Sequence, residues 1–128
     1  ARRRFVKLAS RANVLGYAAE VQVGTRWSLI RNFDALPNGA IPDFRSPLTG
    51  AVHEVKNRIR ISATRQKGQL LKLAEWCAAN GRKLYIHVRP ATQGVAATTQ
   101  KLLQQFPHLT VEVVDDVSDS LAVVRALL

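Results

Sequence analysis

The second half of the sequence alternates between helical and strand patterns, and this alternation limits the possible folds more than any other feature. In order, the segments are a helix over 65–79, a strand over 83–88, a helix over 94–105 and a strand over 109–114. Asn80 and Gly81 form a good terminator for the first of these helices. Strands that alternate with helices in this way run parallel and are joined by crossovers. The pattern therefore predicts an α/β fold.

The first half of the sequence predicts a helix followed by three strands. Apolar residues recur at helical spacing over 10–24, and Ser10 is a suitable N-cap. Strands are expected at 26–33, 41–45 and 51–62, the last two joined by a turn at 47–50. A final helix is expected over 117–127. The predicted fold is a mixed central sheet flanked by helices, in the order α-β-β-β-α-β followed by a further α, β and α.

Length and composition favour one domain. The chain has 128 residues, so residues 1–128 are expected to form a single unit. No apolar run is long enough to cross a bilayer, so we expect a soluble protein without membrane insertion. The single cysteine, Cys77, is expected to pack in the core and cannot form an internal disulfide. The lack of methionine fits a piece cut from a longer polypeptide, although removal of a Met before Ala1 explains the same fact.

The charge of the chain indicates the class of its partner. The net charge is +10, and four of the nine acidic residues lie within 112–128, so the basic excess is concentrated in the preceding residues. A surplus of this size attracts polyanions, of which nucleic acid is the commonest. Charge alone does not distinguish a binding protein from an enzyme.

Three residues of the predicted hairpin suggest a chemistry. Residues two apart in a strand share a face, so Glu54 and Lys56 are expected to project together. Asp43, on the neighbouring strand, is expected to come near Glu54 because cross-strand partners lie roughly 5 Å apart. Two adjacent carboxylates repel each other unless a cation lies between them. An ordinary hairpin with surface ion pairs explains an isolated E-x-K tripeptide equally well, so that tripeptide alone is no evidence.

A divalent metal ion is the usual cation at such a pair. Mg²⁺, or Mn²⁺ in its place, prefers hard oxygen ligands and keeps several waters. Asp43, Glu54 and the backbone carbonyl of Val55 are the expected protein ligands. Such a site favours phosphodiester hydrolysis, with Lys56 orienting the water or stabilising the developing negative charge.

The longer motifs GYAAE, IPDF, HEVKN and QLLKLAEWCAANGRKLYIHVRP resemble the PD-(D/E)xK, or restriction-endonuclease-like, nuclease superfamily. More narrowly, they look like the restriction-endonuclease-fold toxin domains at the C-termini of bacterial polymorphic and contact-dependent growth inhibition toxins. The resemblance covers about residues 12–90. It implies a restriction-endonuclease-like core, and a chain that is the C-terminal toxin domain of a larger protein.

The resemblance also implies roles for individual residues. Asp43 and Glu54 would be metal ligands and Lys56 the catalytic lysine. Glu20, in the first helix, would be an auxiliary acid that reaches the metal directly or through water, although it also fits the charged edge of an amphipathic helix. Gln69 matches a glutamine that often lines such sites, and Gln66 is the alternative.

Basic residues surround the proposed site in sequence and are expected to bind nucleic acid; they are Arg45, Arg58, Arg60, Arg65 and Lys67. Arg58 and Arg60 are expected to continue the Glu54 face along one strand and to form a phosphate-binding track. An evenly solvated basic surface is the competing interpretation. His53 should face away from Glu54, and His87 should be a hydrogen-bonded core residue.

The leading functional hypothesis is therefore a Mg²⁺-dependent endonuclease that acts as an antibacterial toxin, with DNA the favoured substrate. Cleavage of tRNA or other RNA is the first alternative, because the same site hydrolyses either backbone. A Holliday-junction resolvase-like enzyme and a noncatalytic nucleic-acid-binding module are the others. A toxin would be secreted or delivered within a larger bacterial protein, would act in the target-cell cytoplasm, and would need an acidic immunity protein that covers the basic cleft.

Overall fold

The computed structural model describes residues 11–118, which form helices and strands in alternation over most of their length. The elements are α2 (Arg11–Trp27), β1 (Ile30–Arg31), β2 (Phe44–Arg45), β3 (Val52–Lys56), α3 (Arg65–Asn80), β4 (Lys83–Val88), α4 (Val95–Gln105) and β5 (Thr110–Val114). The predicted helix at 117–127 lies outside the described residues. None of the helices within residues 11–118 combines the length and apolar character that crossing a membrane requires.

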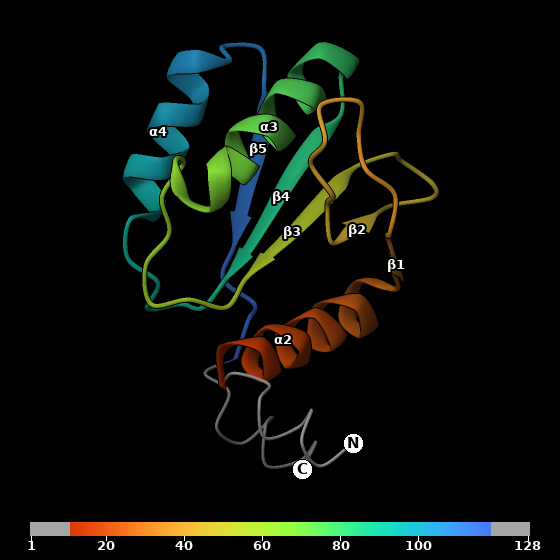
Figure 1. Ribbon diagram of the computed structural model, residues 1–128, viewed down its shortest axis with the longest axis vertical. Helices are drawn as coiled ribbons and strands as arrows, with labels where there is room; N and C mark the ends of the chain where they lie inside the picture. The colour runs from red at the N-terminus through yellow and green to blue at the C-terminus, as the bar shows by residue number, and fades with distance from the viewer. Residues whose placement is uncertain (1–10, 119–128) are drawn as a thin grey trace.

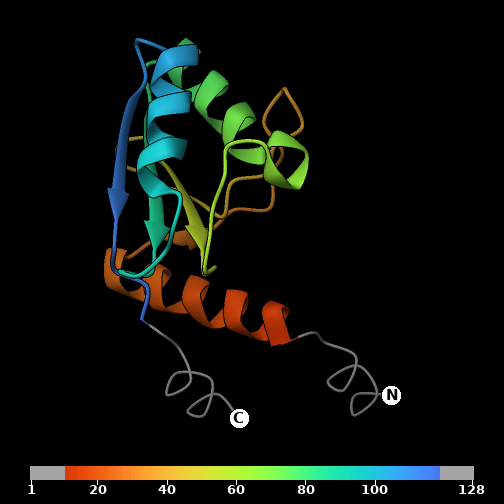
Figure 2. The same ribbon diagram turned by 90° about the vertical axis from the view of Figure 1, so that its left-hand side faces the viewer.

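The five strands form one mixed sheet in the order β1-β2-β3-β4-β5. The pairs β1–β2 and β2–β3 are antiparallel, whereas β3–β4 and β4–β5 are parallel. Helices α3 and α4 cover one face of the sheet, and α2 crosses the carboxyl ends of the parallel strands (Figures 1 and 2). The predicted α/β class and mixed sheet are confirmed.

Two apolar clusters hold the layers together. The larger joins α3 and α4 to the sheet through side chains with no exposure, including Leu73, Leu84, Ile86 and Leu102. The smaller packs α2 against the sheet, with Val23 and Phe44 among its members. Cys77 is buried in the larger cluster, which confirms its predicted packing role. Burial of these side chains is the main force that seats the helices on the sheet.

The first predicted strand, at 26–33, is wrong at its start. Helix α2 continues through Trp27, and β1 contains only Ile30 and Arg31. The indole Nε1 of Trp27 donates a hydrogen bond to Asp116 Oδ2 at 2.7 Å, and this contact holds the last turn of α2 against the end of the sheet. The strand predicted at 41–45 is likewise shorter, and pairs only at Phe44–Arg45.

The strand predicted at 51–62 ends at Lys56, so Arg58 and Arg60 do not continue the Glu54 face; that prediction is wrong. The backbone N–H of Arg58 donates to the Lys56 carbonyl at 3.0 Å, which turns the chain out of the strand. Asn57 accepts hydrogen bonds from Arg89, so the turn is fixed from the neighbouring β4 side. Arg60 instead forms an isolated parallel bridge with Gln93.

A polar chain is buried on the α2 side of the sheet. His53 Nδ1 lies 2.9 Å from His87 Nε2, and His87 Nδ1 lies 3.0 Å from Asp116 Oδ1. The ring of Trp27 lies edge-on to both histidines, and Tyr85 stacks on His53. The predictions that His87 is a hydrogen-bonded core residue and that His53 faces away from Glu54 are confirmed.

Gly94, the N-cap of α4, provides a test of backbone packing. It has φ +82°, and a Cβ there would lie 2.4 Å from the carbonyl oxygen of Ile61. We expect Gly94→Ala to lower the free energy of unfolding by about 3 kcal/mol, since it combines left-handed strain with overpacking. The matched control is Gly39→Ala, because Gly39 has φ +86° and no atom within 4 Å of its Cβ position. Denaturant unfolding should show a loss of only about 1 kcal/mol for the control; equal losses would contradict the packing account.

The buried histidines predict acid sensitivity. Burial, followed by the neighbouring His87, lowers the pKa of His53 from 6.5 to about 4. The unfolded chain therefore binds a proton at His53 between about pH 6.5 and 4 while the folded chain does not, so this residue lowers the free energy of unfolding as pH falls through that window. The full effect is on the order of 3 kcal/mol.

The substitution His53→Gln replaces the imidazole with a neutral amide, which does not titrate. The difference in unfolding free energy between the parent and this variant should change by about 3 kcal/mol between pH 7 and 4. The titrations of other groups cancel in this comparison. A pH-independent difference would contradict the lowered pKa of His53.

Candidate metal and catalytic site

Asp43 and Glu54 meet where β2 approaches β3. The β2–β3 register pairs Phe44 with His53, which places Asp43 opposite Glu54 at the next position. The backbone N–H of Asp43 donates to Glu54 Oε1 at 3.2 Å, and the backbone N–H of Val55 donates to Asp43 Oδ2 at 2.7 Å. Each strand therefore holds a carboxylate of the other. We call these two reciprocal hydrogen bonds the carboxylate clasp.

Lys56 shares the face of Glu54, as the two-residue spacing predicts. Its Nζ lies 3.2 Å from Glu54 Oε2 and also donates to Gln66 Oε1. Both side chains are buried, with Glu54 3% and Lys56 8% exposed. Val55 points to the other face and packs with the α2 cluster. A buried ammonium and carboxylate are thus presented from one short strand.

Glu20 reaches the same place from α2. It is half-buried, is close enough to Asp43 for the two carboxyl groups to interact, and forms an ion pair with Arg31 Nη1 at 3.2 Å. The structure therefore brings the predicted auxiliary acid to the carboxylate clasp. Arg31 was not among the residues predicted from sequence. No pattern connects it to Glu20, because their contact depends on how the chain turns after α2 at Ser28, where φ is +53°.

The surroundings of Glu54 and Glu20 raise the pKa of both carboxyl groups. Burial, followed by the charge of Asp43, raises the pKa of Glu54 from 4.5 to about 8, and Lys56 opposes this shift. Burial, followed by the neighbouring Asp43 carboxyl group, raises the pKa of Glu20 from 4.5 to about 7, and the charge of Arg31 opposes this shift. When all three carboxyl groups are ionised, their negative charges outnumber the two neighbouring cations, Lys56 and Arg31. The three carboxyl groups form an environment that a further cation would stabilise.

Two glutamines hold the charged groups. Gln69 Nε2 donates to Glu54 Oε2 at 3.3 Å and to the Ile41 carbonyl at 2.9 Å, so it connects α3 to the carboxylate clasp. Gln66, the alternative considered from sequence, holds Lys56 instead. Both glutamines therefore contact the predicted residues, and each serves a different partner.

Gln66 lies in a strained turn at the start of α3. Gln66, Lys67 and Gly68 have φ values of 55°, 58° and 72°, so three consecutive residues adopt the left-handed conformation. Only glycine visits this region at little cost, and each other residue costs about 1–2 kcal/mol. Such strain is often found where a side chain must be held for function.

Asp43, Glu54 and the Val55 carbonyl carry oxygen donors of the kind that hard divalent cations prefer. Within residues 11–118, no group of three or more His, Cys, Asp and Glu side chains is arranged to hold a metal ion. The clasp nevertheless offers two carboxylates, Asp43 and Glu54. The N–H and C=O of a strand residue point toward the same neighbour, so the Val55 carbonyl faces the Asp43 side. Few protein oxygens suit Mg²⁺, which keeps several of its waters.

The predicted nucleic-acid-binding residues divide into groups. Arg58, Arg60 and Arg65 line a small hollow together with Lys56 and Gln66, so they lie beside the site. Arg45 does not join them: its guanidinium lies 4.7 Å from the ring centre of Trp76, and its Nε is buried without a partner among the described residues. Lys67 is exposed within the left-handed turn.

Comparison of the chain with protein-family models, curated proteins and solved structures found no match.

Two substitutions in the left-handed turn distinguish the backbone strain of the turn from the contact between Gln66 and Lys56. Lys67→Gly should raise the free energy of unfolding by about 1 kcal/mol, because it removes left-handed strain; Gln66→Gly should give a smaller gain or a loss, because it also removes a hydrogen bond to the buried Lys56 ammonium. Only Gln66→Gly removes the contact to Lys56. Lys56 Nζ chemical shifts, measured by NMR, should change in Gln66→Gly and not in Lys67→Gly. Equal spectra for both variants would contradict the role of Gln66 in holding Lys56.

Proposed function

We propose that the protein is a metal-dependent nuclease that hydrolyses phosphodiester bonds. The observation that supports this most strongly is the carboxylate clasp with Lys56 beside it on the same face. A buried acid–lysine pair next to a second carboxylate has little structural benefit, since charges taken out of water are costly unless fully compensated. Strongly perturbed carboxyl groups gathered in one place are typical of functional sites.

In this proposal Asp43, Glu54 and the Val55 carbonyl hold a divalent cation, with Mg²⁺ expected and Mn²⁺ a substitute. When bound, the cation would supply charge neutralisation at the phosphate and a more acidic water. Glu20 lies next to Asp43 and would accept hydrogen bonds from water molecules bound to the cation. Gln69 keeps the carboxylate of Glu54 oriented through its hydrogen bond.

Lys56 contacts the substrate in this proposal. Its ammonium carries three N–H donors, and two contacts, to Glu54 and Gln66, are present among the described residues. A third donor is thus left for a non-bridging phosphate oxygen or the attacking water. Because the ammonium is buried and held from two sides, it needs little reorganisation to stabilise the charge that develops on the phosphate.

The substrate class is inferred from charge and from the sequence motifs. The net charge of +10 and the three arginines beside Lys56 support a nucleic acid. The resemblance to toxin nucleases favours DNA cleavage in the cytoplasm of a target cell, with tRNA the alternative. A toxin of this kind would be delivered within a larger bacterial protein. An acidic immunity protein would complement the basic surface beside the site.

The direct test is digestion of plasmid DNA and total tRNA with Mg²⁺, Mn²⁺ or EDTA. We expect metal-dependent cleavage that EDTA abolishes, and a loss of at least about 100-fold for Asp43→Asn, Glu54→Gln and Lys56→Met. Glu112→Gln and Lys101→Met are matched controls at exposed positions and should retain activity. Absence of cleavage with every divalent ion, or full activity in Asp43→Asn and Glu54→Gln, would refute the proposal.

A further inference from the structure

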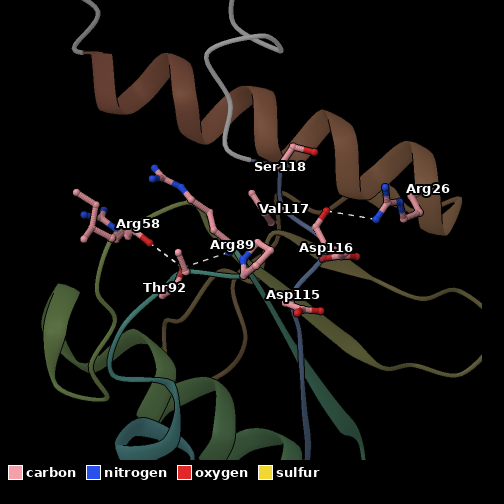
Figure 3. Close-up of a pocket in the computed structure, with 11 residues that line it drawn as sticks. Arg26, Arg58, Arg89, Thr92, Asp115, Asp116, Val117 and Ser118 are labelled. Atoms are coloured by element: carbon pink, nitrogen blue, oxygen red, sulfur yellow. Dashed lines mark hydrogen bonds between the residues drawn. The ribbon is translucent and has the colours of Figure 1, made fainter.

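A cavity of about 530 Å³ lies at the carboxyl ends of the parallel strands. Figure 3 shows it between α2 and the segments that follow β3, β4 and β5. Its volume is within the range of about 300–1,000 Å³ that is typical of small-molecule sites. Ligands of α/β proteins commonly bind outside the carboxyl ends of the strands. The place and the size both suit a bound group.

The lining of the cavity combines cations with apolar surface. Arg26, Arg58 and Arg89 contribute three guanidinium groups from three separate segments. Apolar surface is contributed by Ile59, Pro90, Ala91 and Val117. Arginine binds phosphate in a bidentate manner and also stacks on flat rings. A lining of this composition matches a nucleotide, which carries both an anion and an aromatic base.

Some charged side chains of the cavity have hydrogen-bond partners among the residues that the structure describes, and others do not. Arg26 Nη1 donates to the Asp116 carbonyl at 3.3 Å, and Arg89 bonds Asn57. Arg58 forms no side-chain hydrogen bond or ion pair with any residue that the structure describes. Asp115 is exposed in the same cavity and, within residues 11–118, is not ion-paired. An arginine for phosphate and a carboxylate for the amino edge of a base are thus available together.

Arg58 connects this cavity to the proposed catalytic site. It lines the large cavity and also the small hollow that contains Lys56 and Gln66. Only Asn57 separates it from Lys56 in the chain. A polynucleotide whose phosphate lies at Lys56 can therefore pass Arg58 and place a neighbouring nucleotide in the cavity.

We propose that this cavity binds one unpaired nucleotide adjacent to the phosphate that is cleaved. This inference depends on the proposed nuclease function and specifies its substrate as a single strand or a loop of DNA or RNA. A base stacked within a duplex cannot enter a hollow in a protein unless it is first removed from the stack, which costs a few kcal/mol. Unpaired nucleotides enter without that cost.

The test measures binding in EDTA, where the proposed cleavage does not occur. The probes are fluorescent DNA and RNA trinucleotides, the same trinucleotides with one abasic position, and the same trinucleotide sequences held base-paired within the stem of a stable hairpin. We expect the intact single strand to bind about 10-fold more tightly than both the abasic strand and the duplex. Ala91→Trp, which fills the cavity, and Arg58→Gln should remove this preference, whereas Lys101→Gln should keep it.

Equal binding of intact and abasic strands, or of single strand and duplex, would refute the inference. Binding and cleavage measured together distinguish failure of this inference from failure of the nuclease proposal. Base-dependent binding without cleavage would refute the nuclease and retain a nucleotide-binding cavity. Metal-dependent cleavage without base-dependent binding would leave the nuclease proposal intact and remove the cavity from it.

Discussion

The carboxylate clasp, the pair of hydrogen bonds that joins Asp43 to Glu54 and Val55, is the interaction on which the site depends. It fixes the register of the chain beyond the two paired residues of β2 and sets Asp43 beside Glu54. The Asp43 carboxylate also accepts the Val55 backbone N–H at the point where the β2–β3 pairing stops, so that donor of β3 is satisfied. The same two hydrogen bonds thus serve the fold and place the charges.

The sheet divides polar groups between two faces. Glu54 and Lys56 lie on the α3 side, where Gln66 and Gln69 hold them. The alternate residue His53 belongs to the buried chain that ends at Asp116 on the α2 side. Because alternate side chains of a strand face opposite ways, one five-residue strand carries both networks on opposite faces. Helix α2 also contributes to the site, because its Glu20 lies beside Asp43.

The parts of the structure that follow from periodicity could be predicted from sequence. The shared face of Glu54 and Lys56, the opposite placement of His53, and the strand at 83–88 all depend only on a two-residue repeat and an apolar run. The end of β3 could not be predicted in this way. It depends on the contact of Asn57 with Arg89, which is 32 residues away in the chain.

The roles of the two glutamines were also beyond prediction from sequence. A helical pattern over 65–79 places Gln66 and Gln69 on a regular helix, three residues apart. In the structure Gln66 is the first residue of the left-handed turn and Gln69 follows it, so Gln66 contacts Lys56 while Gln69 contacts Glu54. The turn uses two non-glycine residues at positive φ, against local preference. Contacts formed only in the folded chain therefore determine which glutamine holds the lysine.

The central claim is that Asp43 and Glu54 together form a site for one divalent cation, and calorimetric titration with Mn²⁺ tests it most directly. The parent protein should bind Mn²⁺ with release of protons, because Glu54 has a raised pKa and must lose its proton to ligate. Asp43→Asn and Glu54→Gln should each abolish this binding, while Glu112→Gln should not change it. Binding of the same strength in all four proteins, or no binding in the parent, would contradict the account.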